Sequence, residues 1–448
     1  MNIHFIAVGG SIMHSLAIAL KQAGHNVTGS DDQIYDPAKS KLAQHGILPD
    51  REGWDPARIT EDLDAVILGM HAFDDNPELA KARALGLDIY SFPAFMFEHA
   101  RNKQRVVIAG SYGKTTITSM IMHVLQGLGL PFDYLVGAQV PGFQNAVRLS
   151  DDAPVLLLEG DEYLASKLDP RPKFLLYHPH ITVISGISWD HINVFPTEEM
   201  YVEQFGLLLD SMDKAGSVIY HSEDKDLSKL VESRLDPDQH YIFPYKTPKY
   251  RVKDGKFAIT LEGEERAMKV MGKHNMANIA AAWGVCSLMS VDVKDFLDQM
   301  ATFEGAKLRL EYLEETDHKV VIRDYAHAPA KVQATVEAVR ERYKQENLIA
   351  CLELHSFSSL NKDYLPYYKD TMKGADQRIV YVNPHAWEKR RMPALNQADI
   401  TQAFGDEGLT FVTDAGQLNG ILQGAKNGND VVLMMSSGNF GGIDLDSL

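Results

Sequence analysis

The residues best suited to chemistry form one glycine-containing loop, Gly110-Ser111-Tyr112-Gly113-Lys114-Thr115-Thr116. A β-branched apolar run, Val106–Ala109, precedes the loop, and a helical pattern runs from Thr116 to about Gly127. Loop glycines let backbone N–H groups surround phosphate oxygens, and a helix start adds positive potential. Lys114 would meet the β- and γ-phosphates of a nucleotide, and the Thr115 hydroxyl would bind Mg²⁺. The loop therefore predicts a triphosphate site, although it lacks the early glycine of the common Walker spacing.

Acidic residues follow the next buried-strand candidate along the chain. Val155–Leu158 leads into Glu159-Gly160-Asp161-Glu162, and a further strand, Ile181–Ile184, comes before Asp190-His191. Open α/β sheets bind ligands outside the carboxyl ends of their strands, and carboxylates suit a Mg²⁺–nucleotide site. Taken alone, the acidic stretch favours a solvated loop, and His191 an ordinary surface or core histidine. Beside the phosphate loop, they are candidate ligands.

Four further polar clusters are weak signals individually, because each is also compatible with an ordinary turn. In the second cluster, Asn275 is placed to cap a predicted helix. The clusters are Gly9-Gly10 with Asp31 after a βαβ start, Gly272–Asn278, Lys307–Glu311 and Asp324–Pro329.

The elements that must position these residues alternate between strand and helix throughout. The 448 residues suggest about three domains at roughly 150 residues each. The composition shifts predict domains at 1–100, 101–302 and 303–448, with a hairpin at Tyr250–Leu261 in the second. The predicted class is α/β, with largely parallel sheets: Rossmann-like first and last domains around a central P-loop ATPase-type domain.

Composition excludes several function classes. Lys and Arg number 44 against 61 Asp and Glu, a net charge of −17, so a general nucleic-acid or anionic-membrane binder is not expected. We see no apolar run long enough for membrane insertion and no signal peptide. The two cysteines, Cys286 and Cys351, stand far apart in apolar segments. This predicts buried thiols and a cytoplasmic location.

In this order, the clusters resemble the Mur ligases, ATP-dependent amide-forming enzymes of peptidoglycan synthesis and recycling, and they cover nearly the whole chain. The resemblance implies ATP and Mg²⁺ as cofactors, no nucleic acid and no obligate protein partner. It implies that the first domain binds a UDP-sugar, the central domain ATP, and the last domain the incoming amine. Lys114, His191 and Glu159 would be catalytic.

The resemblance also assigns binding roles. Thr115, Glu159 and His191 would bind the metal. The ATP-binding set would be Gly110, Ser111, Gly113, Lys114, Thr115, Thr116, Asn278, Arg309 and Asp324. The substrate-binding set would be Gly9, Gly10, Ser11, Asp31, Asp161, Glu162 and His327.

The N-terminal stretch resembles the branch of the family that takes UDP-N-acetylmuramate. Within this branch the incoming amine is either the tripeptide L-alanyl-γ-D-glutamyl-meso-diaminopimelate, as in recycling, or L-alanine. Four stretches favour the tripeptide: Val140–Phe143, Glu162-Tyr163, Asp169–Phe174 and Met435–Gly442.

The chain also departs from the family at several positions. Ala7 stands where a glycine is usual, Ser111-Tyr112 replaces Thr-His or Thr-Asn, and Ala328 replaces the second histidine of D-Y-x-H-H-P. Glu353–Ser359 differs from the E-P-R-S-N of the recycling type, which leaves both amines open.

Two other classes are alternatives. An NAD-dependent oxidoreductase would explain the N-terminal βαβ unit but would leave Gly113-Lys114-Thr115 without a role. A P-loop regulator would hydrolyse ATP without forming a bond.

Overall fold

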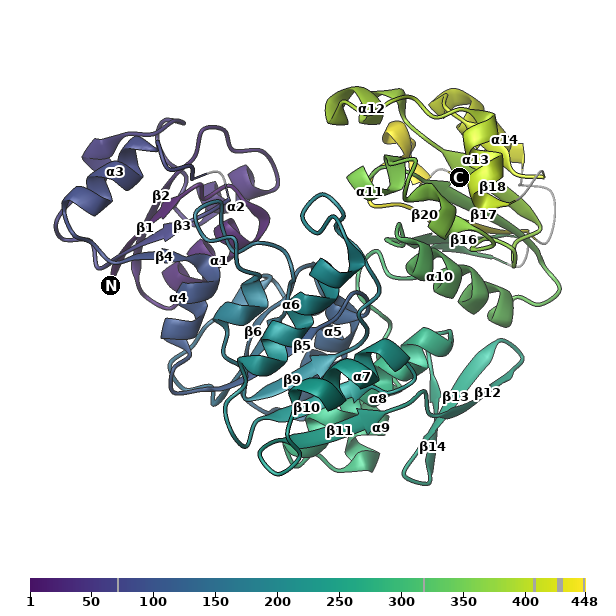
Figure 1. Cartoon of the computed structure of the whole chain (residues 1–448), viewed down its shortest axis with the longest axis horizontal. Helices are drawn as coiled ribbons and strands as arrows, with labels where there is room; N and C mark the ends of the chain where they lie inside the picture. Colours follow the sequence, from purple (N-terminus) through teal and green to yellow (C-terminus); the bar gives the residue numbers. More distant parts are fainter. Residues whose placement is uncertain (71, 317–318, 406–407, 425–429, 446–447) are drawn as a thin grey trace. The chain divides into compact units, whose positions relative to one another are not determined.

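The computed structural model describes residues 1–448 except 71, 317–318, 406–407, 425–429 and 446–447. Strands and helices alternate along the described chain, and the strands form four sheets (Figure 1). This arrangement confirms the predicted α/β class. No helix in the described part is long and apolar enough to cross a bilayer. The chain forms two compact units. One contains Met1–Gly110, Ile117–Ile187 and Glu203–Pro244, and the other contains Ser111–Thr116, Ser188–Val202 and Tyr245–Leu448.

The N-terminal sheet has four parallel strands in the order β2-β1-β3-β4. Its central strands are buried apolar runs, as both faces of a parallel sheet are covered. The elements of this part are β1 Asn2–Ile6, α1 Ser11–Gln22, β2 Asn26–Ser30, α2 Ala38–Gln44, η1 Pro56–Arg58, β3 Ala65–Leu68, α3 Pro77–Ala84, β4 Ile89–Ser91 and α4 Phe92–His99.

The central sheet has seven strands in the order β11-β10-β9-β5-β8-β6-β7. Strand β5 pairs in parallel with β8 on one side and β9 on the other, so the carboxyl ends of all three meet at one edge. The elements are β5 Gln104–Ala109, α5 Lys114–Gly127, β6 Asp133–Leu135, β7 Val147–Arg148, β8 Val155–Glu159, η2 Lys173–Leu176, β9 Ile181–Ile184, α6 Glu198–Asp210, β10 Ser217–His221, α7 Lys225–Arg234 and β11 Tyr241–Tyr245.

A small antiparallel sheet, β12-β13-β14, follows and confirms the predicted hairpin. The last sheet has the order β15-β16-β20-β17-β18-β19, and only its edge strand β15 is antiparallel among the described strands.

The elements after residue 245 are as follows. The strands are β12 Lys249–Lys253, β13 Lys256–Leu261, β14 Glu264–Met268, β15 Glu311–Glu315, β16 Lys319–Asp324, β17 Asn347–Glu353, β18 Gln377–Tyr381, β19 Thr410–Val412 and β20 Asp430–Met435. The helices are α8 Lys273–Leu288, α9 Val293–Met300, α10 Pro329–Arg342, α11 Phe357–Leu360, η3 Leu365–Tyr368, α12 Pro384–Arg390, α13 Gln397–Phe404, α14 Ala415–Gly424 and η4 Phe440–Gly442.

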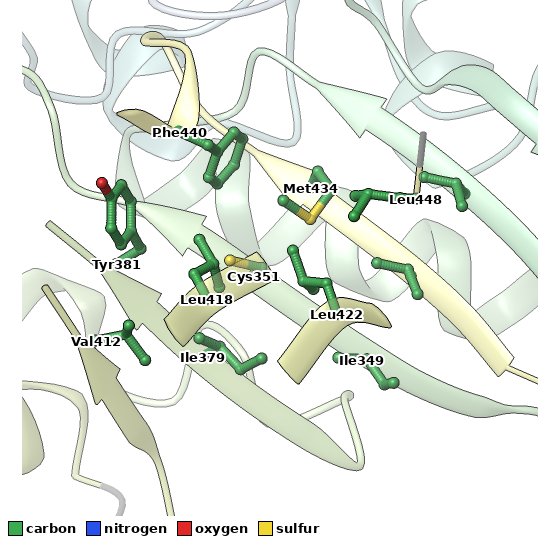
Figure 2. Packing of buried hydrophobic residues seen from close by; sticks show 12 residues of the cluster. Ile349, Cys351, Ile379, Tyr381, Val412, Leu418, Leu422, Met434, Phe440 and Leu448 are labelled. Carbon is green, nitrogen blue, oxygen red and sulfur yellow. The ribbon is translucent and has the colours of Figure 1, made fainter. Parts of the chain in front are cut away.

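The C-terminal sheet packs a continuous apolar core. Cys351 and Met434, from the neighbouring strands β17 and β20, lie in it fully buried, together with Tyr381 of β18 and Phe440 (Figure 2). Cys286 is also buried, and neither thiol is in a disulfide. Burial raises the pKa of the Cys351 thiol above its ordinary value, so it stays protonated. The prediction of buried thiols is confirmed.

Two local predictions were wrong. Helix α5 begins at Lys114, earlier than the predicted Thr116. Asn275 does not cap α8: Gly272, with φ of +90°, is the N-cap residue, and the Asn275 side chain donates to the Met271 carbonyl. An N-cap residue directly precedes the first helical residue, whereas Asn275 lies inside α8, which begins at Lys273. The domain limits 1–100, 101–302 and 303–448 remain predictions.

Candidate active site

The loop after β5 has backbone geometry that requires glycine. Gly110 has φ of +128°, and a Cβ there would lie 2.2 Å from Ser185 Oγ and 2.8 Å from the Ser185 backbone nitrogen. Gly113 has φ of +77°, in the region that only glycine enters readily. Because Lys114 is the first residue of α5, the loop places the start of a helix directly after the turn. This is the arrangement that anion sites use.

The hydroxyl groups of this loop support a nucleotide ligand. Ser111, Thr115 and Thr116 are all buried. The Ser111 Oγ atom has no hydrogen-bond partner among the described residues. A buried polar atom without a partner costs about 1–3 kcal/mol, and a phosphate oxygen would satisfy it. The residues present therefore fit a bound nucleotide.

Glu159 ends β8 beside the strand that carries the loop. Its Cα is in register with Ile108 of β5. One carboxylate oxygen, Oε2, accepts a hydrogen bond of 2.7 Å from the Gly137 backbone N–H. This anchor fixes the carboxylate at the carboxyl edge of the sheet. We did not predict Gly137. Its only signal in the sequence is that it follows the apolar residues Leu135 and Val136, which the structure shows to be buried.

Asp161 and Glu162 lie in the loop that follows β8. Asp161 Oδ2 is 2.5 Å from Lys173 Nζ, and the same ammonium lies 5.7 Å from the centroid of the Tyr163 ring. An antiparallel bridge joins Leu164 to Pro172, so this segment folds back on itself. Glu162 is fully buried. The stretches Glu162-Tyr163 and Asp169–Phe174, predicted separately, thus form a single loop.

The N-terminal glycines are joined to the predicted Asp31. The Gly9 N–H donates to Asp31 Oδ2 over 2.7 Å, and Gly10 is the N-cap residue of α1, which begins at Ser11. Burial, with Asp32 beside it, raises the pKa of Asp31 to about 6. Ala7 adopts φ of +68°, a left-handed conformation that glycine enters more readily than alanine. The predicted substrate-binding residues of the N-terminal part, Gly9, Gly10, Ser11 and Asp31, therefore lie close together.

Two of the predicted nucleotide residues meet at the end of β16. Asp324 accepts backbone N–H groups from Leu310 and Ala326, each over 2.7 Å. The Arg309 guanidinium lies 4.8 Å from the centroid of the Tyr325 ring. Asp324 therefore holds the turn that carries Arg309, a positioning role that the sequence did not indicate.

His327 and Asn278 are held by neighbours within the same unit. The His327 carbonyl accepts a hydrogen bond from the Tyr368 hydroxyl, and burial lowers the pKa of its imidazole to about 4. Asn278 donates to Asn275 Oδ1 over 3.2 Å. The imidazole of His327 is thus neutral at physiological pH.

His191 sits on a constrained segment. Its φ is +56°, and its backbone N–H donates to Asp190 Oδ1 over 2.8 Å. Asp190 is held in turn by Lys331 of α10, and the carbonyl of Trp189 accepts a hydrogen bond of 3.2 Å from the Tyr364 hydroxyl. Burial alone would raise the pKa of Asp190, but Lys331 and His191 together lower it below its ordinary value. Asp190 is therefore ionised.

The predicted residues divide between the two units. The first unit contains Gly9, Gly10, Ser11, Asp31, Gly110, Glu159, Asp161 and Glu162. The second unit contains Ser111, Gly113, Lys114, Thr115, Thr116, His191, Asn278, Arg309, Asp324 and His327.

Within the described residues, no group of three or more His, Cys, Asp or Glu side chains could hold a metal. The predicted magnesium set of Thr115, Glu159 and His191 includes only two such side chains and remains a prediction. A cavity of about 690 Å³ lies elsewhere in the first unit, lined by α1, Phe132, Tyr134 and the segment 142–149. It includes Phe143 of one stretch that favoured the tripeptide.

Three family descriptions match nearly the whole chain. A Mur ligase family catalytic-domain description matches residues 2–104, the Mur ligase middle domain matches 108–286, and the Mur ligase glutamate ligase domain matches 308–438.

Individual relatives extend this likeness. The UDP-N-acetylmuramate–L-alanyl-γ-D-glutamyl-meso-2,6-diaminoheptandioate ligase of Haemophilus influenzae is 27% identical, over 99% of this chain and 97% of that protein. The UDP-N-acetylmuramate–L-alanine ligase of Lactobacillus helveticus is 29% identical, over 98% and 96%. The solved structure of the tripeptide-type ligase from Neisseria meningitides is 27% identical with a TM-score of 0.60, over 68% of this chain and 99% of that one. The chain belongs to the Mur ligase family, whose members are ATP-dependent ligases that form amide bonds.

Proposed function

We propose that this enzyme joins the carboxylate of UDP-N-acetylmuramate to the α-amine of L-alanyl-γ-D-glutamyl-meso-diaminopimelate in peptidoglycan recycling. The observation that carries this choice is the loop after β8, where Asp161, Tyr163 and Lys173 contact one another. It unites two of the stretches that favour the tripeptide type. The chain is also similar over its full length to the Haemophilus influenzae ligase whose name specifies this tripeptide, which supports the same choice.

The chemistry requires activation of a poor acyl donor. A carboxylate would have to expel oxide, whereas an acyl phosphate, formed by transfer of the γ-phosphoryl group of ATP, expels phosphate. The approach of the carboxylate to the triphosphate is opposed, since like charges about 4 Å apart repel by roughly 4 kcal/mol at an effective dielectric near 20. Lys114, at the start of α5, offsets this repulsion and stabilises charge on the transferred group.

The remaining residues supply binding. We assign the UDP-sugar to Gly9, Gly10, Ser11 and Asp31, and the nucleotide to the phosphate loop with Asn278, Arg309 and Asp324. Thr115, Glu159 and His191 would hold Mg²⁺, which when bound neutralises phosphate charge. A histidine is an unusual ligand for this hard cation. We place the reaction in the cytoplasm, where two free buried thiols persist.

An L-alanine ligase is the second candidate. It is favoured by the likeness to the Lactobacillus helveticus enzyme and by His355-Ser356, which replaces the Arg-Ser of the recycling type. The two candidates differ only in the incoming amine.

A competition assay separates them. Equal concentrations of L-alanine and tripeptide are offered together with ATP and UDP-N-acetylmuramate, and the products are weighed by mass spectrometry. We expect the UDP-muramoyl-tripeptide to predominate. Predominance of UDP-muramoyl-alanine would establish the second candidate, and ATP hydrolysis without either product would contradict both.

A further inference from the structure

Two stretches without an assigned role converge at the carboxyl edge of the C-terminal sheet. They are Glu353–Ser359, after β17, and Met435–Gly442, after β20. The two strands pair in parallel, with Leu352 opposite Met435. Gly438 packs so closely that a Cβ there would lie 2.7 Å from Glu353 Oε2 and 2.8 Å from His355 Cγ. Ligands of parallel α/β sheets bind at this edge.

Glu353 is a buried carboxylate satisfied on one side only. Its exposed fraction is 1%. Oε2 accepts the Phe440 backbone N–H over 2.9 Å and the Ser436 hydroxyl. The Phe440 ring stacks on Tyr381 in the apolar core, which fixes this donor (Figure 2). Oε1 has no hydrogen-bond partner in the described part of the chain.

His355 lies against the unsatisfied oxygen. Its Nδ1 is 3.8 Å from Glu353 Oε1 and is buried without a hydrogen-bond partner among the described residues. One third of the side chain is nevertheless exposed, although Nδ1 is buried, so part of the ring beyond Nδ1 reaches the surface. At 3.8 Å the carboxylate makes no hydrogen bond to Nδ1, but its negative charge favours the tautomer with the proton on that nitrogen, which leaves the other nitrogen as the acceptor.

Burial of the His355 ring favours its neutral form. Burial lowers the pKa of His355 below its ordinary value, Glu353 acts in the opposite direction, and Arg390 and Lys389 of α12 lower the pKa further. The imidazole is therefore available to accept a proton at neutral pH.

We propose that His355 is a catalytic residue that takes the proton from the incoming amine, and that Glu353 is its positioning residue. The inference rests on the proposed function. The ammonium of the peptide gives one proton to His355 Nε2. The neutral nitrogen then attacks the acyl phosphate carbon, so that the C–N bond forms as the C–O bond to phosphate breaks, and the second proton leaves with phosphate.

Hydroxylamine provides the test, because it is already neutral at neutral pH and traps the acyl phosphate as a hydroxamate without a base. In His355→Gln we expect peptide coupling to fall by about 10²–10⁴, with hydroxamate formation from ATP and UDP-N-acetylmuramate retained. Glu353→Gln should show the same selective loss to a smaller extent. The matched control is His385→Gln, since His385 is an exposed histidine paired with Glu388 in the same part of the chain. It should leave both reactions unchanged.

The outcomes are distinct. Full peptide coupling in His355→Gln, or equal loss of both reactions in His355→Gln and in His355→Asn, would overturn the inference. His355→Asn is included because its amide nitrogen can take the place of Nδ1 beside Glu353 but supplies no base. If the wild-type enzyme itself forms no hydroxamate, the proposed function fails, and this inference fails with it.

Discussion

Lys331 Nζ lies 3.1 Å from Asp190 Oδ2, across 141 positions of sequence. Asp190 is nearly buried, Lys331 is about one quarter exposed, and the next residue after Asp190 is the candidate ligand His191. Trp189, on the other side of Asp190, packs edge-on against Tyr364 and Tyr367. The segment that carries His191 is therefore held by residues of α10 and of the region around η3.

Removing this cation should destabilise the segment. Lys331→Met leaves the buried carboxylate of Asp190 unpaired, and we expect the free energy of unfolding to fall by about 1–2 kcal/mol, less than for a fully buried pair. Denaturant unfolding measures the change. The control is Lys362→Met, which breaks the more exposed pair with Asp399 and should cost at most about 1 kcal/mol. Equal losses in the two variants would contradict the special role of Lys331.

Asp31 should make stability depend on pH with a defined sign. Its pKa in the folded protein is raised to about 6 by burial, above roughly 3.9 in the unfolded chain. The stabilising contribution is thus fully present below pH ~4 and is lost as pH rises through about 6. Asp31→Asn should gain in melting temperature, relative to wild type, between pH 4 and pH 7.

The control for this prediction is Asp236, whose pKa is lowered by the Gln239 side chain. Asp236→Asn should be less stable than wild type above about pH 4, and its difference in melting temperature from wild type should stay nearly constant between about pH 5 and pH 7. A pH-independent difference between Asp31→Asn and wild type would rule out the burial of an ionisable Asp31 as its cause.

Ala7 should be a site of backbone strain. A non-glycine residue at φ of +68° carries a penalty of about 1–2 kcal/mol. We expect Ala7→Gly to raise the free energy of unfolding by about 0.5–1 kcal/mol after the entropy cost of glycine. Ala17→Gly, at a buried position within α1, should instead lower it by about 1 kcal/mol. Destabilisation of both variants to the same degree would argue against strain at Ala7.

Lys114 tests the phosphate loop. Lys114→Ala should lower turnover by about 10²–10³, the effect of losing one preorganised charge donor. Circular dichroism of the variant checks that α5 is intact. Near-normal turnover by a folded Lys114→Ala protein would remove the loop from the mechanism.

Much of this architecture follows from local sequence signals. Val106–Ala109 is a continuous apolar run rich in β-branched residues, and this run with the glycines after it sufficed to predict β5 and the turn. The structure shows all four residues buried. The edge strands β14 and β15 were not predicted, because Glu264–Met268 and Glu311–Glu315 are charged and only partly buried. Such segments form strands because they pair with neighbouring strands, and their own residue types do not indicate it.

The site was predictable as a set of residue types, but its contacts were not. Glu159 follows an apolar strand, which is a local signal. The Asp190–Lys331 pair and the approach of Gly438 to His355 depend on strand order and crossover connections between distant segments. For Asn275 the local signal was misleading: its residue type suits a helix cap, but Gly272 is the N-cap residue of α8.

The transfer of oxygen tests the central claim most directly. UDP-N-acetylmuramate labelled with ¹⁸O in its carboxylate is incubated with ATP, tripeptide and the wild-type enzyme, and the released phosphate is weighed. If the carboxylate is activated as an acyl phosphate, one labelled oxygen must leave with phosphate when the amine attacks. Phosphate that carries no label, in a reaction that forms the amide, would contradict the account.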